Sequence, residues 1–282
     1  MDDRLATFME QRPRLLRLAY RYLETAADAE DVVQDAWLRY CRVEAPHHAG
    51  KLLTTIVTRL ALDKLRSAAH RRETYVGEWL PEPLADTAEP DPAALDISYA
   101  VMACLKALGP AERAAYFLHD IYDMSFADIA ETIGHSPANC RKLAQRARAA
   151  LAAAKPRFRP TQHDLARFVH AFDASNSSGN LAPLKALLAE GVEFVSDGGG
   201  KAAAATHIIR GPDAVARLML GLARKREHEQ LAYAIRSVNG DPAIAIRAGG
   251  GLDAIVSFSL DAAGRVNGLY VVRNPDKLQR LQ

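Results

Sequence analysis

The chain has 282 residues, 49% of them hydrophobic, and a formal net charge of +2. This length predicts about two domains, each with enough apolar residues for a packed core. Three scattered cysteines without a CxxC pair exclude a disulfide framework and a cysteine zinc site. The charged N-terminus and the lack of a long apolar run predict neither a signal peptide nor a membrane span. We therefore expect a reduced, cytoplasmic protein with no bound metal or cofactor.

Charge is distributed unevenly along the chain. Residues 51–72 contain six Lys or Arg and one acid, residues 76–100 contain six acids and no base, and residues 136–160 contain seven Lys or Arg and no acid. Two basic blocks around an acidic one indicate two contacts with a polyanion, joined by a tether that avoids it. Ordinary solvated helix faces are the alternative.

The first half of the chain has helical periodicity. Apolar residues recur at helical spacing within 15–22, 32–37 and 52–69, and Ala45–Gly50 reads as a loop. Residues 76–97 combine four prolines with acids and predict a linker. Helical pattern returns at Ile97 and continues, with breaks, to Ala154.

The composition changes again from Thr161 onward. Helical stretches are expected at Leu165–Phe172, at Leu181–Leu188 and after Gly211-Pro212. Four strands are expected at the end of the chain, over 231–238, 243–247, 254–260 and 266–272. This alternation predicts a separate α+β domain with an antiparallel sheet.

The densest local signal is SFADIAETIGHSPANCRKLAQRARAAL at Ser125–Leu151. Gly134 suits a tight turn between two helices, while Ser136 can cap the second helix and Pro137 can begin it. The outer arc of the second helix would carry polar and basic side chains, namely Asn139, Arg141, Lys142, Gln145, Arg146 and Arg148. This pattern predicts a helix-turn-helix that reads the major groove of DNA. A basic surface helix that serves stability alone is the alternative.

Several segments together resemble an extracytoplasmic-function sigma factor of RNA polymerase. ADAEDVVQDAWLR at residues 27–39 resembles the region 2 helix that binds the polymerase clamp, and LTTIVTRLALDKLR at residues 53–66 resembles the helix that melts and reads the −10 element. LGPAER at residues 108–113 and the helix-turn-helix resemble region 4, which reads the −35 element. The resemblance covers about residues 3–154 and implies binding to polymerase core and promoter DNA.

The resemblance also implies roles for individual residues. The region 2 helix has an acidic, hydrogen-bonding face that suits a basic partner protein and consists of Glu30, Asp31, Gln34 and Asp35. A solvated surface is the other interpretation of this face. Basic residues of the next helix can hold backbone phosphates: Arg59, Lys64 and Arg66. The loop before it contains His47, His48 and Lys51, and these DNA-binding candidates could meet a flipped base. That helix has few aromatic residues for a member of this family.

Three short motifs resemble the subgroup with a fused SnoaL-like C-terminal domain. They are WLPEP (Trp79, Pro81, Glu82, Pro83), DGGGK (Asp197, Gly198, Gly199, Gly200, Lys201) and NPDKL (Asn274, Pro275, Asp276, Lys277, Leu278). DGGGK departs from the phosphate-binding P-loop, because Ala202 replaces its Ser or Thr and Val195 its first glycine. Its glycines instead suit a tight turn with a close backbone approach; a plain turn between strands is the alternative. We expect the three motifs to be regulatory.

The expected architecture is therefore multidomain: two all-α sigma domains, the second with the helix-turn-helix, and an α+β, cone-shaped SnoaL-like domain. The expected boundaries are 1–75 for region 2, 76–97 for the linker, 98–156 for region 4 and 161–282 for the C-terminal domain. The expected function is transcription initiation regulated by the C-terminal domain, without enzymatic activity. An enzyme using an acid–base pair among His170, His207, Asp213 and Asp253, or a sensor of an unidentified small ligand, is the alternative for that domain.

Overall fold

The computed structural model describes residues 2–44, 48–73, 75–85, 98–105, 108–153 and 158–282. It contains two compact units. The helical unit comprises Met1–Thr74 and Cys104–Ala154, and the sheet unit comprises Tyr75–Ala103 and Lys155–Gln282. Parts of the expected loop (45–47, with His47), of the expected linker (86–97) and of the expected end of region 4 (154–156) lie outside the described residues. The described linker residues 76–85, and Tyr75 before them, group with the C-terminal domain, whereas the four-segment division of the chain stays a prediction.

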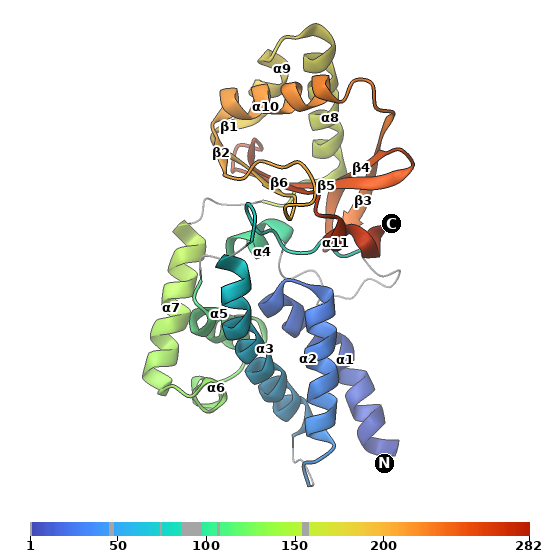
Figure 1. Cartoon of the computed structure of the whole chain (residues 1–282). Helices are drawn as coiled ribbons and strands as arrows, with labels where there is room; N and C mark the ends of the chain where they lie inside the picture. Colours follow the sequence, from blue (N-terminus) through green and yellow to red (C-terminus); the bar gives the residue numbers. More distant parts are fainter. Residues whose placement is uncertain (1, 45–47, 74, 86–97, 106–107, 154–157) are drawn as a thin grey trace. The chain divides into compact units, whose positions relative to one another are not determined.

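The helical unit begins with three helices, α1 (Asp2–Leu23), α2 (Ala26–Tyr40) and α3 (Ala49–Glu73), which pack against one another (Figure 1). The expected apolar stripes form their contact, since Leu18, Val33 and Val57 are almost fully buried. Four further helical segments complete the unit: α5 (Pro110–Tyr116), the π-helical turn η2 (Phe117–Ile121), α6 (Phe126–Ile133) and α7 (Pro137–Ala153). Helix α4 (Tyr99–Leu105) crosses the division between the two units.

The helix-turn-helix forms as its sequence predicts. The Ser125 hydroxyl accepts a hydrogen bond from the Asp128 amide at the start of α6, and Gly134 ends that helix in the left-handed conformation (φ 73°). The Ser136 hydroxyl then accepts from the Asn139 amide, and α7 begins at Pro137. Local chemistry therefore fixes the turn between the two helices.

Among its described residues, the sheet unit contains six strands and five helical elements besides its part of α4. The strands are β1 (Leu188–Asp197), β2 (Ile209–Arg210), β3 (Leu231–Val238), β4 (Asp241–Ala248), β5 (Gly251–Leu260) and β6 (Val266–Val272), in the sheet order β2-β1-β6-β5-β4-β3. The helical elements are α8 (Gln162–Ser178), α9 (Ala182–Ala186), α10 (Pro212–Lys225), α11 (Pro275–Leu278) and the 3₁₀ turn η3 (Gln279–Leu281). The helical unit and this α+β domain confirm the expected fold class.

Both faces of the sheet are covered. Helices α8 and α10 pack on one face (Figure 1). Phe168 and Leu220 of these helices belong to one buried cluster with strand residues such as Phe258. The other face carries Leu80 of the linker, Tyr99 of α4 and the C-terminal Leu278 and Leu281. Linker and tail thus form part of the domain core.

The expected antiparallel sheet is wrong for one pair of strands, because β1 pairs with β6 in parallel. The expected helix over Leu181–Leu188 is also too long, since α9 ends at Ala186 and β1 begins at Leu188. Strand β1 lies between β2 and β6 and is buried over its last four residues. Such a strand lacks the alternation of apolar and polar residues by which strands are recognised.

No helix in the part of the chain that the structure describes is long and apolar enough to cross a membrane.

Candidate functional site

The second helix of the helix-turn-helix, α7, has one buried and one exposed face. Cys140, Leu143, Ala144 and Ala147 are buried. All of the predicted DNA-reading residues of this helix lie on the other side, where Asn139 is half-buried and the others are exposed: Asn139, Arg141, Lys142, Gln145, Arg146 and Arg148. Helix α7 therefore presents a basic, hydrogen-bonding surface of the kind that enters a major groove.

Three of these basic residues contact neighbouring elements. Arg148 forms two hydrogen bonds with Asp120 of η2, at 2.7 and 3.0 Å, and Arg146 pairs with Glu112 of α5 at 3.0 Å. The Arg141 guanidinium lies 5.5 Å from the centre of the Phe126 ring. Arg146 and Arg148 thus also help to hold the helix-turn-helix to the preceding helices.

The predicted basic residues at the start and middle of α3 are exposed, yet they contact α6. The Lys51 ammonium lies 2.6 Å from the Asp128 carboxylate of α6, and this hydrogen bond raises the pKa of Lys51 and lowers that of Asp128. The Arg59 guanidinium donates to the carbonyls of Glu131 (2.7 Å) and Thr132 (3.0 Å). Two basic side chains that the sequence predicts to bind DNA therefore contact the first helix of the helix-turn-helix in this structure.

The other two basic residues of α3 have acidic partners within the same bundle. The Lys64 ammonium lies 2.8 Å from Asp28 and 2.9 Å from Asp31 of α2, and Arg66 pairs with Asp63 one turn away. Asp31 thus also supports α3. The predicted polymerase-binding residues Glu30, Asp31, Gln34 and Asp35 are all exposed on one face of α2.

A buried ion pair joins α5 to the junction of α1 and α2. The Arg113 guanidinium donates to the Glu24 carboxylate (2.9 Å), to the Tyr22 carbonyl (2.9 Å) and to the Leu105 carbonyl (2.8 Å). Both charged side chains are nearly inaccessible, at 3% for Arg113 and 1% for Glu24. The motif LGPAER contains Arg113, but the sequence predicted neither its partner nor its role, because Glu24 lies 89 residues earlier.

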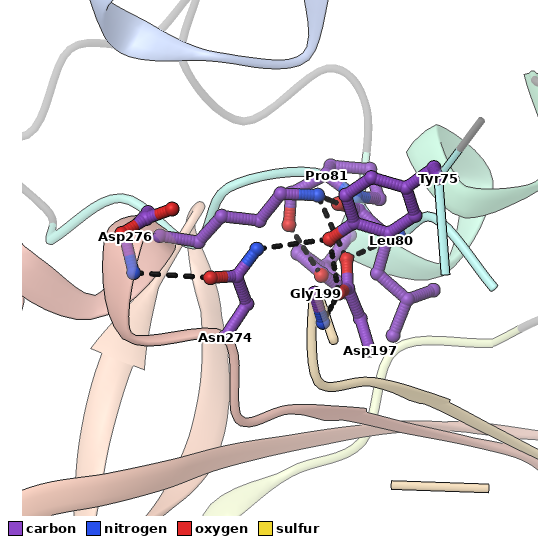
Figure 2. Close-up of polar contacts among 9 residues, drawn as sticks. Tyr75, Leu80, Pro81, Asp197, Gly199, Asn274 and Asp276 are labelled. Atoms are coloured by element: carbon purple, nitrogen blue, oxygen red, sulfur yellow. Dashed lines mark hydrogen bonds and ion pairs between the residues drawn. The ribbon is translucent and has the colours of Figure 1, made fainter. Parts of the chain in front are cut away.

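Residues of the predicted regulatory motifs meet Tyr75 at one place in the sheet unit, which we call the linker clamp: Tyr75, Trp79, Leu80, Asp197, Asn274 and Lys277. Figure 2 shows Tyr75, Leu80, Asp197 and Asn274 of this group. Asp197 is fully buried at its centre. One carboxylate oxygen accepts from the Leu80 amide (2.9 Å) and the Lys277 ammonium (2.7 Å), and the other accepts from the Tyr75 hydroxyl. The clamp thus ties linker, sheet and tail through one buried charge pair.

Aromatic rings and an amide complete the clamp. The Lys277 ammonium lies 3.2 Å from the centre of the Trp79 ring, which contacts Tyr75 edge to face at 4.8 Å. The Asn274 amide donates to the Tyr75 hydroxyl (2.9 Å). Burial and the Asp197 carboxylate raise the pKa of Tyr75, so its hydroxyl stays a donor.

The glycines of DGGGK allow this approach. A Cβ atom on Gly198 would lie 2.1 Å from the Ala202 carbonyl oxygen, and one on Gly199 (φ 60°) would lie 2.3 Å from the Asn274 amide nitrogen. Lys201 at the end of the loop pairs with Asp276 of the tail at 2.6 Å, and both side chains are exposed. The loop is therefore a packing turn against the tail.

The remaining regulatory residues lie around the clamp. Pro81 accepts a hydrogen bond from the Tyr99 hydroxyl (2.7 Å), Glu82 pairs with Arg280 (3.7 Å), and Pro83 and Leu278 are buried. Pro275 begins α11, where the Asn274 side chain caps the helix by accepting from the Asp276 amide.

The four candidate acid–base residues do not come together. Asp253 lines a pocket in the sheet unit, whereas His170, His207 and Asp213 do not. Although burial alone would raise it, hydrogen bonds from Arg273 and Arg226 hold the pKa of Asp253 below its ordinary value. Asp213 pairs instead with Lys185 at 2.6 Å. Within the described residues, no three His, Cys, Asp or Glu side chains form a group that could hold a metal ion.

Two family models match the helical part of the chain: "Sigma-70 region 2" over residues 7–71 and "Sigma-70, region 4" over residues 98–151. ECF RNA polymerase sigma factor SigJ of Mycobacterium tuberculosis is 38% identical and aligns over 97% of this chain and 92% of its own length. A probable ECF RNA polymerase sigma factor SigI of the same organism is 30% identical over 100% of this chain and 97% of its own length. The crystal structure of the extracytoplasmic function sigma factor SigJ superposes with a TM-score of 0.77 at 33% identity, covering 98% of each chain.

Proposed function

This chain belongs to the extracytoplasmic-function (ECF) RNA polymerase sigma factors, and we propose that it directs the polymerase core to −10 and −35 promoter elements under the control of its own C-terminal domain. The observation that carries this proposal is the linker clamp, in which Tyr75 and Leu80 of the segment between the two sigma regions form hydrogen bonds with the buried ion pair of Asp197 and Lys277 in the C-terminal domain. Exposed basic side chains on α7 supply the surface for the −35 element, and the acidic face of α2 supplies a surface for the polymerase.

The contact between α3 and α6 corresponds to a resting arrangement. The −10 and −35 elements lie about 25 base pairs apart, or roughly 85 Å at about 3.4 Å per base pair. Helix α3 and the helix-turn-helix, however, are joined by hydrogen bonds of 2.6–3.0 Å at Lys51 and Arg59. These hydrogen bonds cannot persist while the two parts read elements so far apart, so promoter binding requires them to break.

The linker clamp limits this opening by holding the linker. The 29 residues of Tyr75–Ala103 that join the two parts of the helical unit could extend to about 100 Å at about 3.4 Å per residue. Residues bound to the sheet, from Tyr75 to Ala85 and from Ser98 to Ala103, do not contribute to that length. The 12 residues between them could span only about 40 Å. Release of the linker from the clamp is thus a step toward promoter binding.

The C-terminal domain regulates without turnover in this proposal. Its pocket has Asp253 between two arginines, and a carboxylate held in this way is a poor general base near neutral pH. A cytoplasmic location is part of the same proposal. The pocket makes binding of a small ligand a second proposal for this domain.

The test is run-off transcription by core polymerase with the full chain, with a chain ending at Arg273 and with a chain ending at Pro160. The chain ending at Arg273 loses Asn274 and Lys277 but keeps the sheet, so transcription should rise. The chain ending at Pro160 also loses any support that the domain gives, and transcription should fall below that of the chain ending at Arg273. Equal transcription by the full chain and the chain ending at Arg273, over a range of core concentrations, would contradict control by the clamp.

A further inference from the structure

The sheet unit contains a pocket that the linker clamp does not use. It lies between the sheet and the helices α8 and α10, and its volume is about 140 Å³. Its walls are largely apolar and include Phe168, Phe172, Phe194, Met219, Val256 and Leu269. Tyr233 and Leu222, which also line it, are 44% and 40% exposed, so the pocket is open to solvent.

The size and lining of the pocket favour the binding of a compact apolar molecule. An engineered protein cavity of about 150 Å³ lined by similar side chains stays dry and binds benzene. Water gains few hydrogen bonds along such walls, whereas an apolar ring can replace it and make dispersion contacts with the aromatic and aliphatic side chains. The pocket therefore suits a molecule with about one ring or a short branched chain.

Two carboxylates and two arginines line the pocket, so their charges balance: Asp173, Asp253, Arg226 and Arg273. Asp253 accepts hydrogen bonds at 2.8 Å from both Arg226 and Arg273, whereas Asp173 is exposed. Outside the lining, Arg226 also pairs with Glu229. An anionic ligand would meet these carboxylates, and a cationic ligand would meet two arginines that are already paired.

One hydrogen-bond donor of this charged group has no acceptor among the described residues. This donor is the Nε of Arg273, but it is buried, so a ligand in the pocket reaches it only after a small movement of the Arg273 side chain. A neutral hydroxyl or carbonyl can interact with such a group without the desolvation penalty of a charge. The polar residues thus favour an uncharged ligand with one polar atom over either ion.

We propose that this pocket binds a compact, uncharged, mostly apolar molecule whose polar atom faces Arg226, Asp253 and Arg273. Arg273 directly precedes Asn274 of the linker clamp, and its amide donates to the Asp197 carbonyl at 2.7 Å. The pocket and the linker clamp therefore meet directly after the end of β6. The binding claim itself does not depend on the proposed function, because binding is measured directly on the purified chain.

The experiment compares three single-ring probes of similar size, namely phenol, benzoate and benzylamine, by saturation-transfer NMR and calorimetry with the full chain. Phenol should bind at least tenfold more tightly than either charged probe. Ala223→Phe, a half-buried lining residue of α10, fills the pocket and should weaken phenol binding at least tenfold. Ala214→Phe, on the same helix but exposed and outside the lining, should leave phenol binding unchanged.

Folding of the variants is checked by their thermal unfolding midpoints, and Ala223→Met replaces Ala223→Phe if the larger ring destabilises the domain. The proposal is overturned if no probe binds, if benzoate or benzylamine binds as tightly as phenol, or if the pocket-filling and control variants bind phenol equally well.

Discussion

Removing the buried cation of the linker clamp should destabilise the sheet unit far more than removing an exposed one. In Lys277→Met the ammonium is lost while the Asp197 carboxylate remains, in a site where the two side chains are 5% and 0% exposed. Leaving one partner of a buried pair uncompensated costs about 3–5 kcal/mol. The matched control is Lys201→Met, whose partner Asp276 lies at a similar distance but in solvent, where a pair contributes about 1 kcal/mol or less.

The assay is urea unfolding followed by the fluorescence of Trp79, in a Trp37→Phe background so that the signal comes from the clamp alone. Lys277→Met should lower the free energy of unfolding of the sheet unit by about 3–5 kcal/mol. Adding Asp197→Asn to it should cost less than the sum of the two single changes, because the second change removes the unpaired charge. If Lys277→Met and Lys201→Met lower the free energy equally, the buried pair does not hold the linker as argued.

Three further predictions concern separate surfaces. Arg141→Ala should weaken binding to the −35 element by about 1–3 kcal/mol in a gel-shift assay, with Arg224→Ala on α10 as an exposed control; equal affinity of the two variants would refute the reading of α7. Asp31→Ala with Asp35→Ala should reduce capture of the chain by core polymerase in a pull-down, and full retention would argue against the acidic face of α2. Because the pKa of Asp253 is lowered in the fold, its stabilising contribution is complete above pH about 4 and is lost as the pH falls through that lowered pKa. Asp253→Asn should therefore destabilise the sheet unit at pH 7 and progressively less below pH 4, and a cost independent of pH would exclude this linkage.

Local signals in the sequence were sufficient to predict most of the helices and the helix-turn-helix. Ser125, Gly134, Ser136 and Pro137 act within a few residues of their partners, so their roles can be read from spacing alone. The four C-terminal strands were also predicted, from strand-like residues with turn signals between them. Strand β1 was not, because the polar Ser196 and Asp197 at its end are buried, and because its parallel pairing with β6 depends on the whole chain between them.

Partners distant in the sequence were the part that could not be predicted. Lys51 and Arg59 have the residue types and spacing of phosphate ligands, yet their contacts lie 72–77 residues away in α6. The prolines and acids of residues 76–97 are typical of a linker, but Tyr75 and Leu80 reach Asp197 across 122 and 117 residues. Composition does not reveal such a contact, because it depends on which surfaces the completed fold brings together.

The central claim is that α3 and the helix-turn-helix are held together at rest and must separate for transcription. The Thr55 and Thr132 hydroxyl oxygens lie 3.3 Å apart across this contact, so Thr55→Cys with Thr132→Cys can form a disulfide after a small adjustment. The exposed Cys41 is replaced by Ser to prevent other pairings, and the Thr55→Cys single variant is the control. Run-off transcription with core polymerase should be at least tenfold lower for the oxidised double variant than for the same protein after reduction. Equal transcription in the oxidised and reduced states, with the disulfide verified by mass spectrometry, would contradict the account.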